Sequence, residues 1–260
     1  RAGEPVAYAT VYHRSEVSAE HRVYVDVQVH PDCWGRGMED PLTDWAIAAA
    51  VDALADSTAT GRYVCAWLFK KQEDAAVRYR KRGFTAVRHW WEMERLLDED
   101  VPLPPEEGFS VVPWAEQHTG PLRLVHNAAF ADHWGSTPFG EERWRKQIME
   151  NPGWRPALSF VAVADAEPIG YAYNEVYEED WEVAGQSEGW IGVLGVAQEW
   201  RKKGVATALL SRSMAAMRAA SSASKRMVSK RSSRCLRAFS AASGSLSMAA
   251  RRASRWSMCF

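Results

Sequence analysis

The sequence predicts an α/β protein built from two similar units, and three observations lead to that prediction. First, Glu4-Pro5-Val6-Ala7-Tyr8-Ala9 reappears as Glu167-Pro168-Ile169-Gly170-Tyr171-Ala172. Second, each copy continues as strand, turn, strand, glycine turn and helix, an order typical of α/β units. Third, 260 residues with 47% apolar and 25% charged positions have room for two small domains.

The first copy shows a clear alternation of strand and helix patterns. Its valines at alternate positions between 23 and 29 are typical of a half-buried strand. After a turn at 31–37, apolar side chains at helical spacing predict a helix of about 15 residues that begins near Glu39. A strand over 63–69, a helix over 73–82 that ends at Gly83 and a last strand region over 85–97 follow. The predicted first unit is 1–97, and it lacks the opening elements of the second copy.

A proline-rich linker at 98–107 separates the copies, and it excludes regular structure. The second unit is predicted to cover 108–220. Strands are expected at 109–113, 158–164, 168–176 and 189–196. Helices are expected at 121–132, 140–149 and 205–219. This copy has an opening but lacks the closing elements of the first copy.

The formal net charge of −1 hides a basic segment at 221–260, which has nine basic and no acidic residues. Its few apolar residues and high charge predict disorder. Two other interpretations stay open: a frameshift near Ala220 in a GC-rich gene, and a divergent ending that folds. A basic arm for nucleic acid is a further alternative, disfavoured because Phe239, Trp256 and Phe260 are its only aromatic residues for base stacking.

Several classes of protein are excluded by what the chain contains. The four cysteines, Cys33, Cys65, Cys235 and Cys259, are too scattered for a disulfide framework and lack zinc-site spacing, so no metal is expected. No stretch approaches the roughly 18 apolar residues of a membrane span, and no secretion signal is recognisable. We therefore expect a cytoplasmic protein that makes no membrane contact; the oligomeric state stays open.

One segment carries recognisable chemistry, because an apolar strand from Trp190 leads into a basic turn that opens a helix. A helix N-terminus presents unpaired N–H groups and a partial positive charge, so it can bind a phosphate. Gly204 lets the backbone approach an anion, and the small Ala206 keeps a side chain out of the way. The segment has neither the P-loop pattern nor the three glycines of a dinucleotide fingerprint. It predicts a pyrophosphate cradle.

The Arg-x-x-Gly-x-Ala pattern between this strand and helix resembles that of the GNAT superfamily of N-acetyltransferases. The resemblance covers 1–97 and 108–220, and the tandem copies resemble mycothiol-synthase-type GNAT proteins of actinobacteria. It implies a mixed, mostly antiparallel sheet with flanking helices in each of two incomplete units, and acetyl-CoA or another acyl-CoA as co-substrate. It also implies cofactor-binding residues: Leu194, Gly195 and Val196 for the pantetheine arm, and Arg201, Lys202, Lys203, Gly204, Val205, Ala206 and Thr207 for the pyrophosphate.

The first copy departs from this pattern. Trp34 stands where the second copy has Arg201, and Glu39 stands where it has Ala206. A carboxylate at the helix N-terminus would compete with a phosphate for the same N–H groups. We therefore expect the first unit to bind coenzyme A poorly and to be a degenerate structural partner. Tyr79 matches a general-acid tyrosine of the family, but beside such a cradle we favour a packing role.

Acetyl transfer to an amine needs a base that removes the amine's proton. Glu188 is the first candidate, because it shares a strand face with Trp190, and Glu175 is the second. Acids at 178–182 lie in an expected hairpin loop, where they would attract a cationic amine without a catalytic role. The resemblance places four residues at the acceptor pocket, although their spacing fits a packed helix equally well: Asn127, Phe130, His133 and Trp134.

These observations predict an N-acetyltransferase whose second unit moves an acetyl or other acyl group from acyl-CoA to a primary amine of a small molecule. Two alternatives belong to other classes: a non-catalytic acyl-CoA-binding or scaffold protein, and a protein that binds nucleic acid through its basic tail. The identity of the acceptor and the length of the acyl chain stay open.

Overall fold

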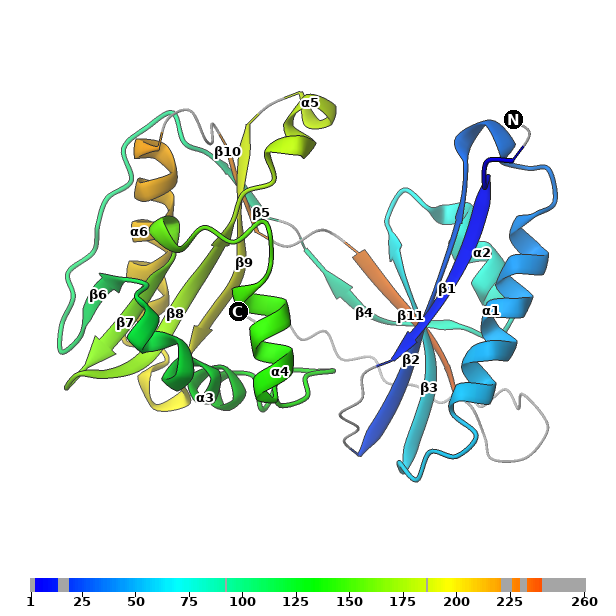
Figure 1. Ribbon diagram of the computed structural model, residues 1–260, viewed down its shortest axis with the longest axis horizontal. Helices are drawn as coiled ribbons and strands as arrows, with labels where there is room; N and C mark the ends of the chain where they lie inside the picture. The colour runs from blue at the N-terminus through cyan, green and yellow to red at the C-terminus, as the bar shows by residue number, and fades with distance from the viewer. Residues whose placement is uncertain are drawn as a thin grey trace. The chain divides into compact units, whose positions relative to one another are not determined.

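The computed structural model describes residues 3–13, 19–91, 93–185, 187–220, 226–229 and 233–239. The chain divides into two units, each with one sheet and its own helices (Figure 1). Unit 1 comprises Arg1–Trp91 and Arg231–Phe260, and unit 2 comprises Glu92–Lys230. This division departs from the predicted boundaries of 1–97 and 108–220, because the chain crosses from one unit to the other twice.

Unit 1 contains a five-stranded sheet in the order β1-β2-β3-β11-β4. Neighbouring strands are antiparallel except β2 and β3, which are parallel. The strands are β1 (Ala7–His13), β2 (Glu20–Val29), β3 (Gly61–Phe69), β4 (Thr85–Trp90) and β11 (Ser233–Phe239). The helices are α1 (Glu39–Ala53) and α2 (Glu73–Lys81).

Helices α1 and α2 contribute to a single apolar core on one face of the unit 1 sheet. The alternating valines of β2 provide its centre, since Val23 and Val25 are buried against Ala46 and Ala50 of α1. Tyr79 of α2 belongs to the same core, and its ring centroid lies 5.0 Å from that of Phe84. Burial raises the pKa of Tyr79 to about 12. These contacts support the packing role that we favoured for this tyrosine.

Unit 2 contains a six-stranded sheet in the order β5-β10-β9-β8-β7-β6, in which only β10 and β9 are parallel. Its strands are β5 (Met93–Leu96), β6 (Ser110–Pro113), β7 (Phe160–Ala164), β8 (Glu167–Glu175), β9 (Glu188–Val196) and β10 (Arg226–Ser229). Its helices are α3 (Thr119–Ala129), α4 (Glu141–Trp144) with a π-helical turn at Arg145–Met149, α5 (Trp181–Ala184) and α6 (Val205–Ala219).

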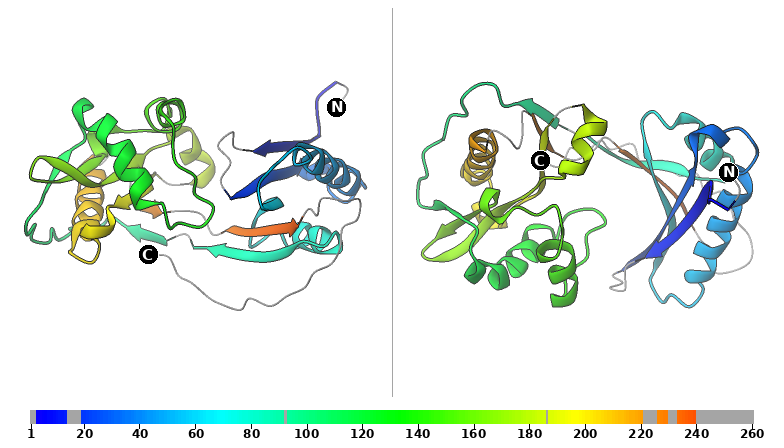
Figure 2. Two further views of the ribbon diagram at one scale, coloured as in Figure 1. Left: turned by 90° about the horizontal axis from the view of Figure 1, so that it is seen from below. Right: turned by 45° about the horizontal axis from the view of Figure 1, so that its top comes forward.

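Helices cover both faces of the unit 2 sheet (Figure 2). On one face α6 buries Leu209 against Ala172 of β8. On the other face, Leu122 of α3 and Trp144 of α4 pack on Tyr171 and Tyr173 of the same strand. Because side chains alternate along a strand, β8 contributes to both cores, which explains its almost continuous burial.

The two sheets repeat one another strand by strand. The order β1-β2-β3-β11 in unit 1 matches β8-β9-β10-β5 in unit 2, with the same parallel and antiparallel pairs. The fourth position is exchanged between the units: β5 follows unit 1 in sequence but belongs to the unit 2 sheet, and β11 follows unit 2 but lies between β3 and β4. The repeat found in the sequence is therefore a repeat of topology, completed by a reciprocal exchange of strands.

This exchange corrects two predictions. The strand region expected over 85–97 is two strands, β4 and β5, which belong to different sheets. The disorder expected over 221–260 is wrong for 226–229 and 233–239, because β10 and β11 pair with neighbours on both sides and satisfy their backbone groups there. The rest of that segment lies outside the described residues, and the frameshift stays a hypothesis that the nucleotide sequence would test.

Removal of residues 231–260 is expected to open the unit 1 sheet and to leave most of unit 2 intact. Without β11, β3 and β4 lose their shared partner, so their amides should exchange with deuterium much faster, whereas β7 and β8 keep theirs. Hydrogen exchange read by mass spectrometry checks this expectation. Unchanged protection of β3 and β4 would contradict the strand exchange.

Two further observations concern the membrane spans and the disulfide framework that the sequence analysis did not expect. Among the described residues, no helix is long and apolar enough to span a bilayer. Of the two cysteines whose side chains are described, Cys33 is a free thiol and Cys65 is buried.

Candidate functional site

The turn between β9 and α6 has a distinctive backbone. A short 3₁₀ turn, Gln198–Trp200, follows β9, and two left-handed residues come next: Lys202 with φ of +63° and Gly204 with φ of +83°. Left-handed backbone is costly for residues with a side chain, so glycine at 204 removes that cost immediately before α6 begins at Val205. No side chain caps this helix start.

The start of α6 presents backbone N–H groups outward. The first amides of a helix have no acceptor within the helix, and here Ala208 already donates to the carbonyl of Gly204 over 3.0 Å. The amides of 205–207 are thus directed out of the helix end. A Cβ placed at Gly204 would meet no atom within 4 Å, so no other part of the described chain packs against this glycine. The arrangement fits the predicted pyrophosphate cradle.

The three basic side chains of the turn differ in their contacts. Arg201 forms a two-pronged ion pair with Asp132 at 2.8 and 3.0 Å, and it also donates to the carbonyl of Ala129 at 2.7 Å. Lys203 lies over the ring of Trp200, with its Nζ 4.7 Å from the centroid. Lys202 is exposed. The charge that we expected from Arg201 at the cradle is therefore balanced by a carboxylate.

The strand that leads to this turn has an edge that is only partly paired. β10 pairs with β9 from Glu188 to Trp190, and beyond that point the only described strand beside β9 is β8. The edge of β9 that contains Leu194, Gly195 and Val196 therefore has backbone groups available for a ligand, as the resemblance implies. Gly192 is an extra residue in the pairing with β8, and this β-bulge interrupts the ladder beside the open edge.

Glu175, the last residue of β8, lies against this bulge. A Cβ at Gly192 would come within 2.6 Å of its Oε2, so the glycine leaves room for the carboxylate. Asn151 donates to Oε1 over 2.7 Å, and the hydroxyl of Tyr177 donates to the amide oxygen of Asn151 over 3.1 Å. Burial raises the pKa of Glu175 above its ordinary value, and hydrogen bonds from Tyr177 and Asn151 lower it less.

Glu188, the first candidate from the sequence, is placed differently. It begins β9 opposite Arg226 of β10, where the sheet is paired on that side, and it is half-buried. Its carbonyl accepts a hydrogen bond from the indole of Trp181 over 3.0 Å. Glu175, by contrast, is opposite Trp190, where the pairing with β10 ends. The structure therefore places Glu175 closer than Glu188 along the strands to the open edge.

The residues expected at the acceptor pocket lie at the end of α3 and in the turn after it. Asn127 exchanges two hydrogen bonds with the backbone of Phe139, which is a structural role. Phe130 approaches β9, since a Cβ at Gly195 would lie 3.1 Å from its ring and 3.1 Å from that of Tyr171. His133 stacks edge-on against Phe130, with ring centroids 5.7 Å apart, and Trp134 follows it in the turn.

The sequence did not reveal a buried pair at the same place. His126 Nδ1 and the hydroxyl of Tyr171 are 2.6 Å apart, and both side chains are buried. Burial raises the pKa of Tyr171 well above its ordinary value, so its hydroxyl stays protonated. The tyrosine belongs to the repeated hexapeptide, but no motif links it to His126, which comes 45 residues earlier.

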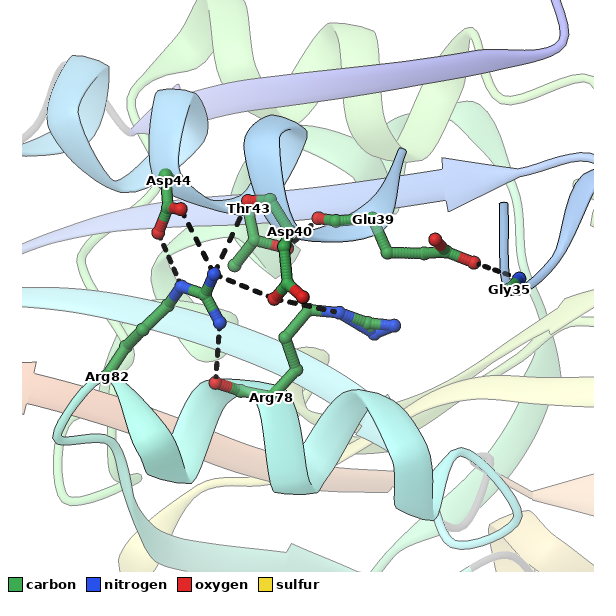
Figure 3. A network of polar contacts seen from close by, with 7 residues as sticks. All are labelled: Gly35, Glu39, Asp40, Thr43, Asp44, Arg78 and Arg82. Carbon is green, nitrogen blue, oxygen red and sulfur yellow. Dashed lines mark hydrogen bonds and ion pairs between the residues drawn. The ribbon is translucent and has the colours of Figure 1, made fainter. Parts of the chain in front are cut away.

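The matching turn in unit 1 has the same backbone and different chemistry (Figure 3). Gly35 and Gly37, with φ of +72° and +83°, adopt the left-handed conformations of Lys202 and Gly204. The carboxylate of Glu39 accepts a hydrogen bond from the amide of Gly35 over 2.8 Å, and this bond lowers the pKa of Glu39. The carboxylate of Glu39 thus binds an amide of the loop before α1, and not an amide of the helix N-terminus that we expected it to cap, because no side chain caps α1.

Further contacts hold the unit 1 turn in place (Figure 3). Arg82, which follows α2, forms ion pairs with Asp40 at 2.8 Å and Asp44 at 2.5 Å in the first turns of α1. Arg78 approaches Asp40 at 4.0 Å. The N-terminal end of α1 therefore carries acidic side chains paired with α2, whereas the matching start of α6 has no acidic residue in its first turn.

Comparisons with known proteins agree with this geometry. Residues 123–236 match the family described as acetyltransferase (GNAT) family. A GCN5-related N-acetyltransferase from Sphaerobacter thermophilus superposes with a TM-score of 0.69 at 21% identity, over 91% of this chain and 78% of that chain. A tandem GNAT protein from the clavulanic acid biosynthesis pathway superposes with a TM-score of 0.61 at 16% identity, over 86% and 76%. At such identities these structures show the fold alone. No curated protein matches the sequence significantly.

Proposed function

We propose that this chain, whose residues 123–236 match the acetyltransferase (GNAT) family, transfers an acetyl group from acetyl-CoA to a primary amine in unit 2. Enzymes of this family are acyl-CoA-dependent N-acyltransferases that act on amines. The observation that carries the assignment to unit 2 is the turn at 201–207, because no side chain caps the start of α6 and its first turn has no acidic residue that would repel an anion. In the matching turn of unit 1, Glu39 already accepts the amide of Gly35.

The chain's residues fit the two ends of the co-substrate. We assign the diphosphate to the amides of 205–207 with Lys202 and Lys203 beside them, and the pantetheine arm to the open edge of β9 at 194–196. Backbone donors and acceptors along such an edge can bind an amide-containing arm as an added strand would bind. Acetyl-CoA supplies the thioester whose acetyl group is transferred.

We assign the role of general base to Glu175, ahead of Glu188. In the step that we propose, the amine nitrogen forms a bond to the acetyl carbon while the carbon–sulfur bond breaks. Before the attack, Glu175 takes one proton from the ammonium group, directly or through water, and after the attack the thiolate takes up the second proton that the nitrogen loses. A carboxylate with a raised pKa is a better proton acceptor than an exposed one, because its basicity lies closer to neutral pH.

The acceptor in this proposal is a small cationic amine. Four acidic residues follow the end of β8 in the short helical turns before β9: Glu178, Glu179, Asp180 and Glu182. Such a cluster raises the local concentration of cations and stabilises none of them by a specific bond. Within this proposal, an acceptor of the mycothiol-synthase type is one candidate among the amines of metabolites and antibiotics.

Release of coenzyme A thiol separates catalysis from simple binding. The purified chain is incubated with acetyl-CoA and a panel of primary amines, and free thiol is measured with a chromogenic disulfide. Amine-dependent thiol release supports the enzyme, while acetyl-CoA binding without release with every amine favours the non-catalytic alternative. Nucleic-acid binding by the tail would instead show affinity that falls steeply with salt and is lost when 221–260 are deleted.

The wild-type chain is expected to bind one acetyl-CoA molecule. In unit 2 the first turn of α6 carries no acidic side chain, whereas in unit 1 the carboxylate of Glu39 accepts a hydrogen bond from the turn. Isothermal titration calorimetry measures the stoichiometry directly. Two equivalent sites per chain would contradict the assignment of unit 1 as a structural partner.

A further inference from the structure

The side-chain contacts of Arg201 do not fit the role that the resemblance implies for it, which is to bind the diphosphate. Both terminal nitrogens of its guanidinium are used: Nη1 and Nη2 bind the two carboxylate oxygens of Asp132, and Nη2 also binds the carbonyl of Ala129. The planar guanidinium fits a carboxylate in this two-pronged way better than a lysine can. The carbonyl belongs to the last residue of α3, so Arg201 also satisfies an orphan group at the helix C-terminus.

We propose that Arg201 is a positioning residue, which ties the cofactor turn to the end of α3 through Asp132 and Ala129, rather than a ligand of the diphosphate. This inference rests on the proposed acetyl-CoA site in unit 2. The positive character of the cradle then comes from Lys202, Lys203 and the amides of α6, none of which Asp132 contacts in the described structure.

The end of α3 that Arg201 holds is the part that reaches β9. Phe130 lies between Ala129 and Asp132, and its ring lies beside Gly195, since a Cβ at 195 would come within 3.1 Å of the ring of Phe130 and of the ring of Tyr171. The same ring contacts His126, with centroids 4.7 Å apart. The contacts of Arg201 with Asp132 and Ala129, which we call the tether, therefore join the diphosphate turn to the aromatic side chains beside the open edge of β9.

Unit 1 provides an internal comparison. Trp34 occupies the position of Arg201 with nearly the same backbone, φ −60° and ψ 142° against φ −65° and ψ 149°. Its indole donates to the carbonyl of Val29, within its own turn, over 2.8 Å. Trp34 therefore makes a contact within its own turn, whereas Arg201 bonds to a segment 69 residues earlier in the chain.

A double-mutant cycle separates the two roles of Arg201. The variants are Arg201→Met, Asp132→Asn and both together, and the measurement is acetyl-CoA affinity by calorimetry. A tether predicts that each single variant weakens binding by a similar factor of about 3–10, and that the double variant is no weaker than either. A diphosphate ligand predicts the opposite: Asp132→Asn leaves affinity unchanged or improves it, and Arg201→Met weakens binding in both backgrounds. That second pattern would overturn the proposal.

Hydrogen exchange of α3 gives a readout that does not depend on affinity. At saturating acetyl-CoA, amides at 126–133 should gain protection in the wild type and gain less in either single variant. Asp132→Glu, which keeps the carboxylate, should restore part of the gain. The matched control is Trp34→Met, which changes the equivalent position of unit 1 and should alter neither affinity nor protection.

Acetyl-CoA binding tests the proposed function, and amide exchange in the free protein tests the tether, so the failure of one can be distinguished from the failure of the other. If the wild type does not bind acetyl-CoA, the proposed function fails. The tether is then read from the free protein, in which the 126–133 amides should exchange faster in Arg201→Met than in the wild type. Equal exchange in the free variants, together with equal protection on binding, would overturn the tether while leaving the acetyl-CoA site in place.

Discussion

Replacement of Gly204 by glutamate is expected to weaken acetyl-CoA binding by at least about 100-fold, which corresponds to about 2.7 kcal/mol. Two effects act in the same direction. A side chain at φ of +83° imposes backbone strain of about 1–2 kcal/mol. The new carboxylate would also stand at the helix end proposed to hold the diphosphate, where like charges repel. Calorimetry with acetyl-CoA measures the change.

Unit 1 offers a matched control for this variant. Gly37 has the same φ of +83°, and a Cβ there would likewise meet no atom within 4 Å. Gly37→Glu therefore introduces the same strain and charge at the other helix start, and it should leave acetyl-CoA affinity unchanged. Gly204→Ala separates strain from charge and should cost less than glutamate. Equal losses from Gly37→Glu and Gly204→Glu would refute the assignment of the cradle to unit 2.

Replacement of Glu175 by glutamine is expected to lower kcat by about 10²–10⁴, the usual contribution of a general base, with little change in acetyl-CoA affinity. The pH profile should change as well. The base acts when ionised, so wild-type activity should fall as pH drops through the raised pKa of Glu175, and the variant should lose that acidic limb. Steady-state rates over a pH series, with the best amine of the panel, measure both effects.

The stability of Glu175→Gln at pH 7 should be equal to or higher than that of the wild type, although its activity is lower. A carboxyl whose pKa is raised by folding holds its proton more tightly in the native state, so its contribution to the free energy of unfolding declines as pH rises from its unfolded value through its folded value. At pH 7 the buried carboxylate is therefore a net cost. Glu175→Gln should keep or raise the Tm at pH 7 while activity falls, which distinguishes it from a variant that merely damages the fold.

Glu188→Gln is the comparison that decides between the two candidate bases. It is expected to retain most activity and the acidic limb, because Glu188 lies where β9 is still paired with β10. Loss of the limb in Glu188→Gln and its survival in Glu175→Gln would reverse our assignment.

Local patterns in the sequence predicted most elements because each depends on neighbours along the chain. Alternating valines led to β2, and helical spacing after Gly37 led to α1 within a residue of its observed start. The choice of partner for a strand is not local. The segment 93–96 has the same strand character whichever sheet it joins, so its place beside β10 could not be read from its residues. The same reason applies to β11.

The part of the candidate site that lies within one short motif could be predicted from the sequence. The parts formed by residues far apart in the sequence could not. The turn at 201–207 is contiguous, and its glycine and basic residues identified it. The raised pKa of Glu175 depends on burial, and its partner Asn151 lies 24 residues earlier. The partner of Arg201 lies 69 residues earlier. A signal for Glu175 did exist, since Gly192 interrupts an apolar strand where a side chain would collide with the carboxylate.

The exchanged strands determine when each of the two sheets can be completed during synthesis on the ribosome. β3 and β4 emerge early, but the strand that lies between them is made about 150 residues later, a wait of roughly 10–30 s at the usual 5–20 residues per second. During that interval the nascent first half has a gap in its sheet with unsatisfied edges, a natural target for chaperones. Unit 2 receives its borrowed strand β5 before its own strands exist. The two sheets are therefore completed at nearly the same time, once 226–239 have been made, although the first half was translated long before.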